Sequence, residues 1–323
     1  MIRRRSLLAT ALAGPALAQA QGAWPSRPVT VIVPWAAGGS TDFIARVVCQ
    51  RLAADLGQPF VVENRPGASG TVGHAAVSRA RPDGYTLLVG ANSTYAMAPH
   101  LIENIGYDSE TGFTPIGLIA RAPIFIAANP RLVPGGLAEF LAAARAQPGR
   151  ITYASSGAGS SAHLAAELLA IMAGVELLHV SYRGGAPAAQ ALVAGEVAMA
   201  PTDAPTALPL MRGGQVKALG VGTTRRTPHA LDVPTVAETD PRLADYACAT
   251  EFAMLAPPGL PAEIQSRLHA GVVAALRHPE AVQRLNEGAM EAIGGSPAEW
   301  APYLRRELEK WGGVIRTRGI RAG

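Results

Sequence analysis

Short apolar runs alternate with helical stretches along most of this chain, and this alternation restricts the possible folds more than any other feature of the sequence. The run at 29–34 is short, apolar and followed by glycines, as expected of a buried strand, whereas 42–56 carries apolar side chains at helical spacing. The same order of strand, loop and helix recurs at 60–90 and at 151–221. Strands that alternate with helices are typical of largely parallel sheets with crossover helices, so we predict an α/β fold.

Two long apolar segments divide this pattern into two units of similar size. Residues 116–129 are longer than an ordinary strand and suit a crossing from one unit to the other, and 252–256 suits the return. Each unit then has its own small sheet, and a chain of 323 residues is long enough for two such cores. The predicted boundaries are 21–123 and 249–323 for lobe 1, and 124–248 for lobe 2.

Residues 1–20 have the three parts of a secretory signal peptide. Three arginines at 3–5 precede an Ala/Leu-rich run at 6–17, and Ala18 and Ala20 supply the small residues of a cleavage site. The run is too short to span a membrane. We expect cleavage near Ala18 or Ala20 and a periplasmic protein. The paired arginines also fit a twin-arginine signal, which we favour over the general secretory route.

Export removes most of the excess positive charge. The chain has 28 basic and 24 acidic residues, and loss of the three signal-peptide arginines leaves 25 basic residues in the mature protein. Only two of these are lysines, Lys217 and Lys310, and no dense basic stripe occurs. A nucleic-acid partner is therefore not expected.

The cysteine and histidine spacings do not predict a metal site. Cys49 and Cys248 are far apart in the sequence, and both a disulfide and two buried free thiols are compatible with export. No C-x-x-C pair and no H-E-x-x-H motif occurs, so we predict neither a metal nor a cofactor.

Two loops of similar design are the best candidates for a ligand site. The first loop, residues 36–41, and the second loop, residues 155–161, each join a strand end to a helix start through glycines and hydroxyl residues. The first amides of a helix have no intrahelical acceptor, and the helix dipole adds positive potential there. Each loop therefore suits an anion, and one loop in each lobe favours an anion held between the lobes.

Three charged residues accompany these loops. Asp42 fits the first turn of the helix that follows the first loop, and Ser40 or Thr41 could cap that helix. Asp203 follows a predicted strand at 197–200, where it could hold a water or a ligand amine. Arg183 could pair with a second ligand carboxylate or with a protein carboxylate across the cleft.

A secreted hydrolase is the main alternative from another class. Ser156 with His163 or His179, and Asp203 as a third member, could form a catalytic triad. The G-x-S-x-G elbow of such enzymes is missing, as is a phosphate-binding P-loop, so we do not expect an enzyme.

A series of motifs occurs in fixed order over essentially the whole mature chain. The motifs are WPSRP at 24–28, IVPWAAGGSTD at 32–42, VENRPGASG at 62–70, PDGYTLL at 82–88, FTPI at 113–116, SGAGS at 156–160, HVSYRGGAP at 179–187 and LAPPGLP at 255–261. In this order they resemble Bug-type receptors, the extracytoplasmic solute receptors of tripartite tricarboxylate transporters. Phe252 stands where that family more often has a tryptophan.

The resemblance implies a two-lobed type II periplasmic-binding-protein fold with two crossing strands, and a carboxylate held by amides, hydroxyls and waters. The expected function is capture of a small mono- or dicarboxylate, aliphatic or aromatic, by a monomeric receptor. Its partners would be membrane permease subunits of a tripartite tricarboxylate transporter, or a sensor with no transporter. The ligand-binding residues implied are Pro34, Ala36, Ala37, Gly38, Gly39, Ser40, Thr41, Asp42, Ser156, Gly157, Ala158, Gly159, Ser160, Ser161 and Asp203.

Overall fold

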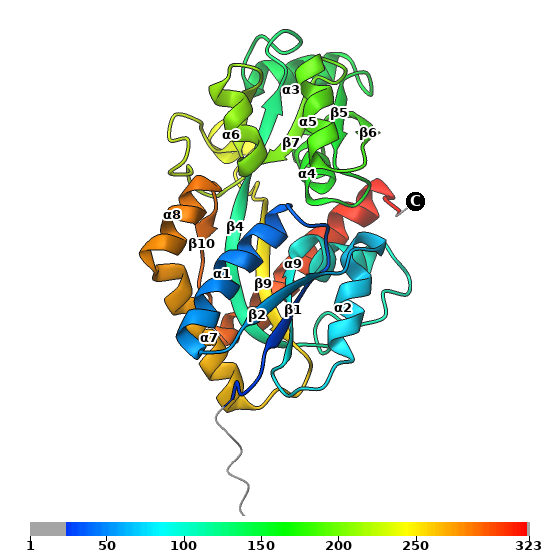
Figure 1. Ribbon diagram of the computed structural model, residues 1–323. Coiled ribbons are helices and arrows are strands. Elements are labelled where there is room, and N and C mark those ends of the chain that lie inside the picture. Colours follow the sequence, from blue (N-terminus) through cyan, green and yellow to red (C-terminus); the bar gives the residue numbers. More distant parts are fainter. Residues whose placement is uncertain (1–23, 322–323) are drawn as a thin grey trace, which may run out of the picture.

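A computed structural model of the protein describes residues 24–321 and has two lobes stacked end to end (Figure 1). The architecture is mixed α/β, as predicted. The expected signal peptide at 1–20 lies outside the described residues. Within the described range, no helix is both long and apolar enough to cross a membrane.

The two lobes have similar composition, and one long strand, β4 (Thr114–Ala128), runs through both (Figure 1). Lobe 1 contains β1 (Val29–Val33), α1 (Ser40–Leu56), β2 (Phe60–Asn64), α2 (Thr71–Ser78), β3 (Thr86–Ala91), a π-helical turn (Ser93–Met97), β9 (Ala249–Ala256), α7 (Ala262–Arg277), α8 (Pro279–Glu287), β10 (Glu291–Ala292) and α9 (Pro297–Arg318). Lobe 2 contains α3 (Leu137–Ala146), β5 (Thr152–Ser155), α4 (Ser161–Ala173), β6 (Leu178–Ser181), α5 (Gly185–Ala194), β7 (Met199–Asp203), α6 (Ala204–Arg212) and β8 (Lys217–Val221).

The ten strands of the described chain form one continuous sheet rather than the two separate sheets expected. The strand order is β2-β1-β3-β9-β4-β7-β5-β6, with β8 and β10 as further partners of β4. Residues 114–123 of β4 pair with β9, and residues 124–128 pair with β7 and β8. The two predicted sheets are thus halves of one sheet, because β4 extends through both.

Strand direction determines which loops meet between the lobes. β1, β2 and β3 are parallel, and β9 is antiparallel to both β3 and β4, so β4 runs in the direction of β1 to β3. β7 is antiparallel to β4 and parallel to β5, so the strands of lobe 2 run the opposite way. As β4 leads from lobe 1 to lobe 2, the carboxyl ends of both sets of parallel strands point at the other lobe.

The two passages of the chain between the lobes lie side by side. The Gly222 amide donates to the Ile124 carbonyl at 2.8 Å, and the Cys248 amide donates to the Gly222 carbonyl at 2.7 Å. A Cβ atom on Gly222 would lie 2.6 Å from both the carbonyl oxygen and the sulfur of Cys248, so only glycine fits this approach. The connection between the lobes, called the hinge below, therefore consists of β4 near Ile124 and the segments around Gly222 and Cys248.

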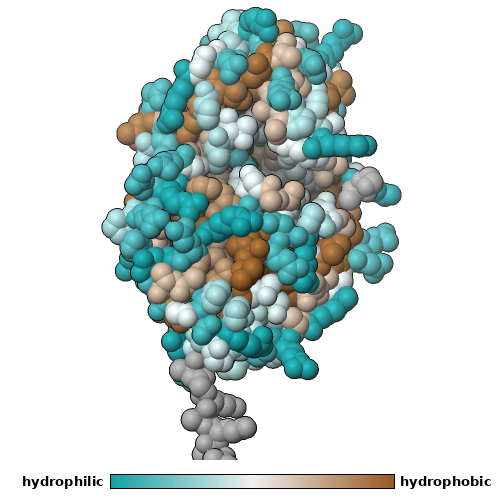
Figure 2. All heavy atoms as spheres, viewed as in Figure 1, coloured by the Kyte–Doolittle hydropathy of each residue, from teal (hydrophilic) through white to brown (hydrophobic). Residues whose placement is uncertain are grey.

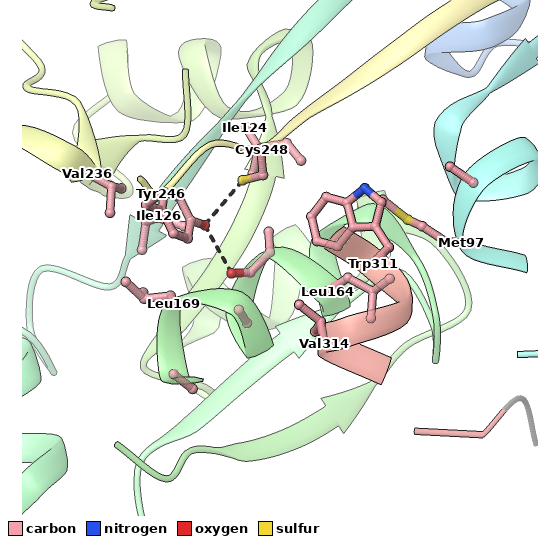
Figure 3. Close-up of a cluster of buried hydrophobic side chains, with 14 of the residues drawn as sticks. Met97, Ile124, Ile126, Leu164, Leu169, Val236, Tyr246, Cys248, Trp311 and Val314 are labelled. Atoms are coloured by element: carbon pink, nitrogen blue, oxygen red, sulfur yellow. Dashed lines mark hydrogen bonds between the residues drawn. The ribbon is translucent and has the colours of Figure 1, made fainter. Parts of the chain in front are cut away.

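Helix α9 joins the lobes on one side of the hinge. It begins against lobe 1 and ends against α4, where Arg318 forms an ion pair with Glu167 at 2.6 Å. Trp311, near its middle, is fully buried beside Met97 of lobe 1 and Leu164 of lobe 2, in a hydrophobic cluster that spans both lobes (Figure 3). This side of the junction is filled with side chains.

Three local features differ from the sequence predictions. Helix α6 was not predicted, since its two prolines argue against a helix; Pro205 occupies the first turn, where no amide is needed. β7 starts two residues later than expected and extends to Asp203. The N-cap of α1 is Gly39 rather than Ser40 or Thr41, and both of the latter are already helical.

Both cysteines are buried free thiols. Cys49 is on the buried face of α1, in the core of lobe 1. Cys248 contacts the Tyr246 hydroxyl at 3.2 Å near the hinge (Figure 3). Burial raises the pKa of each thiol to about 12, so little reactive thiolate forms at neutral pH.

We expect the native protein to resist a thiol reagent such as 5,5′-dithiobis(2-nitrobenzoate), and the denatured, unreduced protein to release two thiols per chain. The physical reason is that both sulfur atoms lose their water only in the folded state. A count near zero in denaturant without reductant would show a disulfide and contradict this prediction.

Candidate functional site

A cavity of about 590 Å³ lies between the lobes, at the carboxyl ends of their parallel strands. Its walls come from the loops after β1, β2 and β3 in lobe 1 and after β5, β6 and β7 in lobe 2. The start of β9 and the turn between α8 and β10 complete it. Where the lobes meet, the surface is recessed and mostly pale, of intermediate hydropathy (Figure 2). Ligands of open α/β sheets bind at such an edge.

Both predicted loops reach this cavity. The predicted residues that line it are Gly38, Gly39, Ser40, Thr41, Ser156, Gly157, Ala158, Gly159, Ser160, Ser161 and Asp203. Four others do not line it. Pro34 packs beneath Gly73, Ala36 and Ala37 are exposed on the first loop, and Asp42 lies behind that loop.

Asp42 positions the first loop instead of facing the cavity. Its carboxylate accepts hydrogen bonds from the Gly38 amide at 2.9 Å, from Arg46 Nε at 3.0 Å and from Asn64 Nδ2 at 2.9 Å. Burial alone raises the pKa of Asp42, but these donors outweigh it and hold the pKa below its usual value. The ionised carboxylate therefore fixes the loop against α1 and β2.

Two histidines position the second loop from behind. His163 Nδ1 accepts a hydrogen bond from the Gly159 amide at 2.9 Å, and His179 Nε2 lies 2.7 Å from Ser155 Oγ. The two imidazole rings stack with centroids 3.9 Å apart and planes 9° apart. The loop is thus tied at both ends to one stacked pair.

Both histidines are neutral at pH 7. Burial, and then repulsion from His179, lowers the pKa of His163 to about 3, and burial also lowers the pKa of His179. Since Nδ1 of His163 accepts the Gly159 amide, its single proton is on Nε2. Protonation of Nδ1 would remove this acceptor.

Helix ends supply the positive potential of the cavity. The first intrahelical bonds run from Phe43 to Gly39 in α1 and from Leu164 to Ser160 in α4, so the amides that precede them have no intrahelical acceptor. These are the amides of residues 40–42 and 161–162. In contrast, the amides of Gly38, Gly157 and Gly159 already donate to protein side chains, so these glycines shape the loops rather than donate to a ligand. Their acceptors are the side chains of Asp42, Ser155 and His163 respectively.

A third loop at residues 184–186 also lines the cavity and was missed. It follows β6 and opens α5, whose N-cap Gly184 has φ 122°. The order strand, paired glycines, helix is the same as in the first two loops, so the signal was present in the sequence. Helix α6 likewise begins at the cavity, with Asp203 as its N-cap residue.

No basic side chain of the described residues lines the cavity. Arg183, a candidate partner for a ligand carboxylate, is exposed and does not line it. The two lysines are engaged elsewhere: Lys217 with the Gly135 carbonyl at 2.5 Å, and Lys310 with Glu307 at 2.5 Å. Helix ends are therefore the main source of attraction for an anion.

Asp203 lies on the hinge side of the cavity. Thr250 Oγ1, at the start of β9, donates a hydrogen bond to Asp203 Oδ1 at 2.9 Å. Burial raises the pKa of Asp203 to about 6, and the bond from Thr250 limits the rise. The carboxylate makes no capping bond to α6.

The remaining wall is apolar and could not be assigned from the sequence. It contains Trp35, Phe43, Leu101, Phe252 and Met290. These residues come from distant segments of both the β1 to β3 region and the C-terminal part of the chain. Their common environment depends on tertiary packing, which local sequence patterns do not specify.

Comparison with known proteins assigns the family. Residues 44–320 match the tripartite tricarboxylate transporter family receptor, abbreviated TctC. The chain belongs to this family. The resemblance seen in the motifs is thereby confirmed, and TctC proteins are receptors for solutes rather than enzymes, as expected.

Curated relatives of similar length support the TctC assignment. The chain is 37% identical over 319 residues to the UPF0065 protein in the tcbD-tcbE intergenic region of Pseudomonas sp. strain P51, which covers 97% of this chain and 94% of the relative. It is 32% identical over 312 residues to protein BugT of Bordetella pertussis, with coverages of 96% and 95%.

Solved structures support both the TctC fold and carboxylate binding in related proteins. R. palustris Rpa4515 with adipate has a TM-score of 0.83 and 35% identity, with coverages of 93% and 100%. MatC from Rhodopseudomonas palustris with bound malate has a TM-score of 0.79 and 33% identity, with coverages of 90% and 100%. The periplasmic binding protein BugD has a TM-score of 0.79 and 31% identity, with coverages of 93% and 100%. The predicted two-lobed periplasmic-binding-protein fold is confirmed.

The hydrolase alternative also lacks the geometry it requires. His179 bonds to Ser155, which is fully buried, and His163 bonds to the Gly159 amide. Ser156, the proposed nucleophile, is not the partner of either histidine. A general base needs to contact its nucleophile directly or through one water.

Gly159→Ala should weaken ligand binding at least tenfold. Gly159 has φ 74°, and a Cβ atom there would lie 2.3 Å from Leu101 Cδ1 of lobe 1. The change therefore strains the second loop at its positive φ and displaces the Leu101 side chain that packs against it. The matched control is Gly174→Ala, which has φ 63° but no atom within 4 Å. The control should lose about 1–2 kcal/mol of stability yet bind normally by calorimetry, and equal affinity of the two variants would contradict the prediction.

The protein should lose stability below about pH 6.5 because its buried histidines are neutral in the folded state. A pKa of about 3 for folded His163, against about 6.5 unfolded, means that acid favours the unfolded chain by about 2 kcal/mol at pH 5. In urea titrations, His163→Gln should reduce the difference between pH 7.5 and pH 5 by this amount. His74→Gln, in lobe 1, should also reduce it, since burial lowers the pKa of His74 to about 4. An unchanged pH dependence in His163→Gln would refute the assignment.

Proposed function

We propose that the protein is a periplasmic receptor that captures a small carboxylate between its two lobes. The observation that carries this proposal is the cavity itself, where helix ends from both lobes converge and no basic side chain of residues 24–321 lines the wall. Such a site recognises negative charge through amides and hydroxyls. The carboxylate ligands named for Rpa4515 and MatC support the same class of ligand.

The delivery partner we propose is a membrane permease of the tripartite tricarboxylate type. Membership of the TctC receptor family supports it, whereas no observation favours a sensor without a transporter. Export through the signal peptide at 1–20 and a monomeric state complete the proposal. The moving bodies would be residues 21–123 with 249–323, and residues 124–248, hinged at Ile124 and Cys248.

Substitution by proline can remove single amides from the site without breaking a helix. Ser40 and Ser161 are the first residues of α1 and α4, and the residues before them are extended, as a following proline requires. Ser161→Pro deletes one amide aimed at the cavity, and Ser161→Ala deletes only the hydroxyl. Ala262→Pro, at the start of α7 and away from the cavity, is the control.

We expect saturable binding of one carboxylate per chain, reported by the fluorescence of Trp35 and by calorimetry. Ser40→Pro and Ser161→Pro should each weaken binding about 10- to 100-fold, because a hydrogen bond to a charged group contributes about 1.5–3 kcal/mol. Ala262→Pro should bind normally. Equal binding of carboxylates and their neutral amides, unaffected by either proline, would refute the proposed function.

A further inference from the structure

The cavity has one ionisable side chain, and it is acidic. Among the lining residues in the described chain, Asp203 alone can carry a charge; the others are glycine, alanine, proline, serine, threonine or apolar residues. A site for an anion that contains its own carboxylate is chemically selective. It attracts one negative charge and repels a second one placed near Asp203.

The strand order places Asp203 relative to the anion loops. Across the sheet of lobe 1, β3 lies beside the hinge strand β9, and β1 lies beside β3 and ends at the first loop. Across the sheet of lobe 2, β7 lies beside the hinge strand β4 and ends at Asp203. β5 lies beside β7 and ends at the second loop. The two anion loops thus occupy equivalent positions, and Asp203 lies one strand closer to the hinge. Neighbouring strands are about 4.8 Å apart.

One carboxylate oxygen of Asp203, a residue that lines the cavity, has no hydrogen-bond partner within the described chain. Oδ1 accepts from Thr250, whereas no donor of residues 24–321 reaches Oδ2. The first helical amides of α6 do not satisfy it either, since the N-cap makes no side-chain bond. An acceptor in this position is satisfied best by a donor on the ligand.

A second ligand carboxylate has no cationic partner here. The rest of the wall includes Trp35, Phe43, Phe252 and Met290, which suit an apolar body. Arg183 is exposed outside the lining, and the α6 helix end already has the Asp203 carboxylate beside it. Charge and hydrogen bonding therefore both point to a single ligand carboxylate.

We propose that the ligand is a monocarboxylate with an apolar body and a hydrogen-bond donor, a hydroxyl or an ammonium group, that binds Asp203 Oδ2 and excludes dicarboxylates. The proposal rests on the function above, since it assumes that the first and second loops hold the ligand carboxylate. Asp203 is then a specificity-determining residue that lies on the hinge side of that carboxylate.

Two matched ligand series test this proposal by calorimetry at pH 8. One is hexanoate, 6-hydroxyhexanoate, 6-aminohexanoate and adipate; the other is 3-phenylpropanoate with hydrogen, hydroxyl, ammonium or carboxylate at carbon 2. In at least one series, the hydroxyl or ammonium member should bind at least tenfold more tightly than the unsubstituted and dicarboxylate members. The two donor members distinguish a hydroxyl ligand from an ammonium ligand.

Asp203→Asn should remove the preference for donors and improve dicarboxylate binding at least tenfold, because an amide donor replaces the charge. Asp203→Ser serves as a second variant, since serine is also favoured at the N-cap position that Asp203 occupies and has no charge. Asp42→Asn changes the hydrogen bonds that hold the first loop from behind. It should therefore change the affinity for all ligands of both series by a similar factor. Arg183→Gln should leave the ranking unchanged.

The outcomes separate this proposal from the proposed function. If carboxylates bind but dicarboxylates bind as tightly as donor-bearing monocarboxylates, or if the ranking survives Asp203→Asn, the specificity proposal is wrong and the receptor function stands. If a dicarboxylate loses affinity in Arg183→Gln, that arginine is its partner and the proposal is also wrong. If no carboxylate binds and neutral analogues do, both proposals are overturned.

Discussion

The antiparallel pairing of β4 with β9 in one lobe and with β7 in the other determines the rest of the structure. Because β4 is continuous, these two pairings make the parallel strands of the lobes run in opposite directions. The loops at their carboxyl ends then meet across one cavity. A parallel pairing of β7 with β4 would turn the second and third loops to the far end of lobe 2. The position of the cavity is thus a consequence of backbone hydrogen bonding before any side chain is considered.

Recognition through amides requires rigid loops, and the side chains around the cavity provide this rigidity. Asp42 ties the first loop to β2 through Asn64, and the stacked histidines tie the second loop to β6 and α4. These polar groups are buried and therefore have to be paired. Some of the glycine amides that were predicted to bind the ligand donate instead to these protein side chains. The amides left for a ligand are those at the helix starts, which are fixed by the helices themselves.

Sequence patterns predicted the α/β alternation, the helix at 42–56 to within two residues of α1, and the first and second loops, because each depends on local spacing. Asp42 was correctly placed in the first turn of its helix, but its direction, away from the cavity, depends on Asn64 and Arg46 at other positions in the fold. Helix α6 was missed because Pro205 and Pro209 count against a helix in any local scale, while burial of Ala204, Ala207 and Leu208 favours it. The apolar wall was missed for a related reason. Trp35 and Met290 line the same cavity only because the order of strands in the sheet brings their distant segments together.

An acidic residue inside an anion site is unfavourable unless it contributes to selectivity. Two carboxylates about 5 Å apart repel by about 3 kcal/mol at an effective dielectric constant of about 20, and each helix end offers only about half a positive charge. A donor on the ligand converts this repulsion into a hydrogen bond to a charged acceptor, which contributes about 1.5–3 kcal/mol. The repulsion weakens binding of a dicarboxylate, and the hydrogen bond strengthens binding of a donor-bearing monocarboxylate. The difference in binding free energy between the two ligands is therefore the sum of both effects. Under the proposed function, Asp203 would therefore affect which carboxylate binds far more than whether a carboxylate binds, since the helix ends of both lobes would attract the first charge in either case.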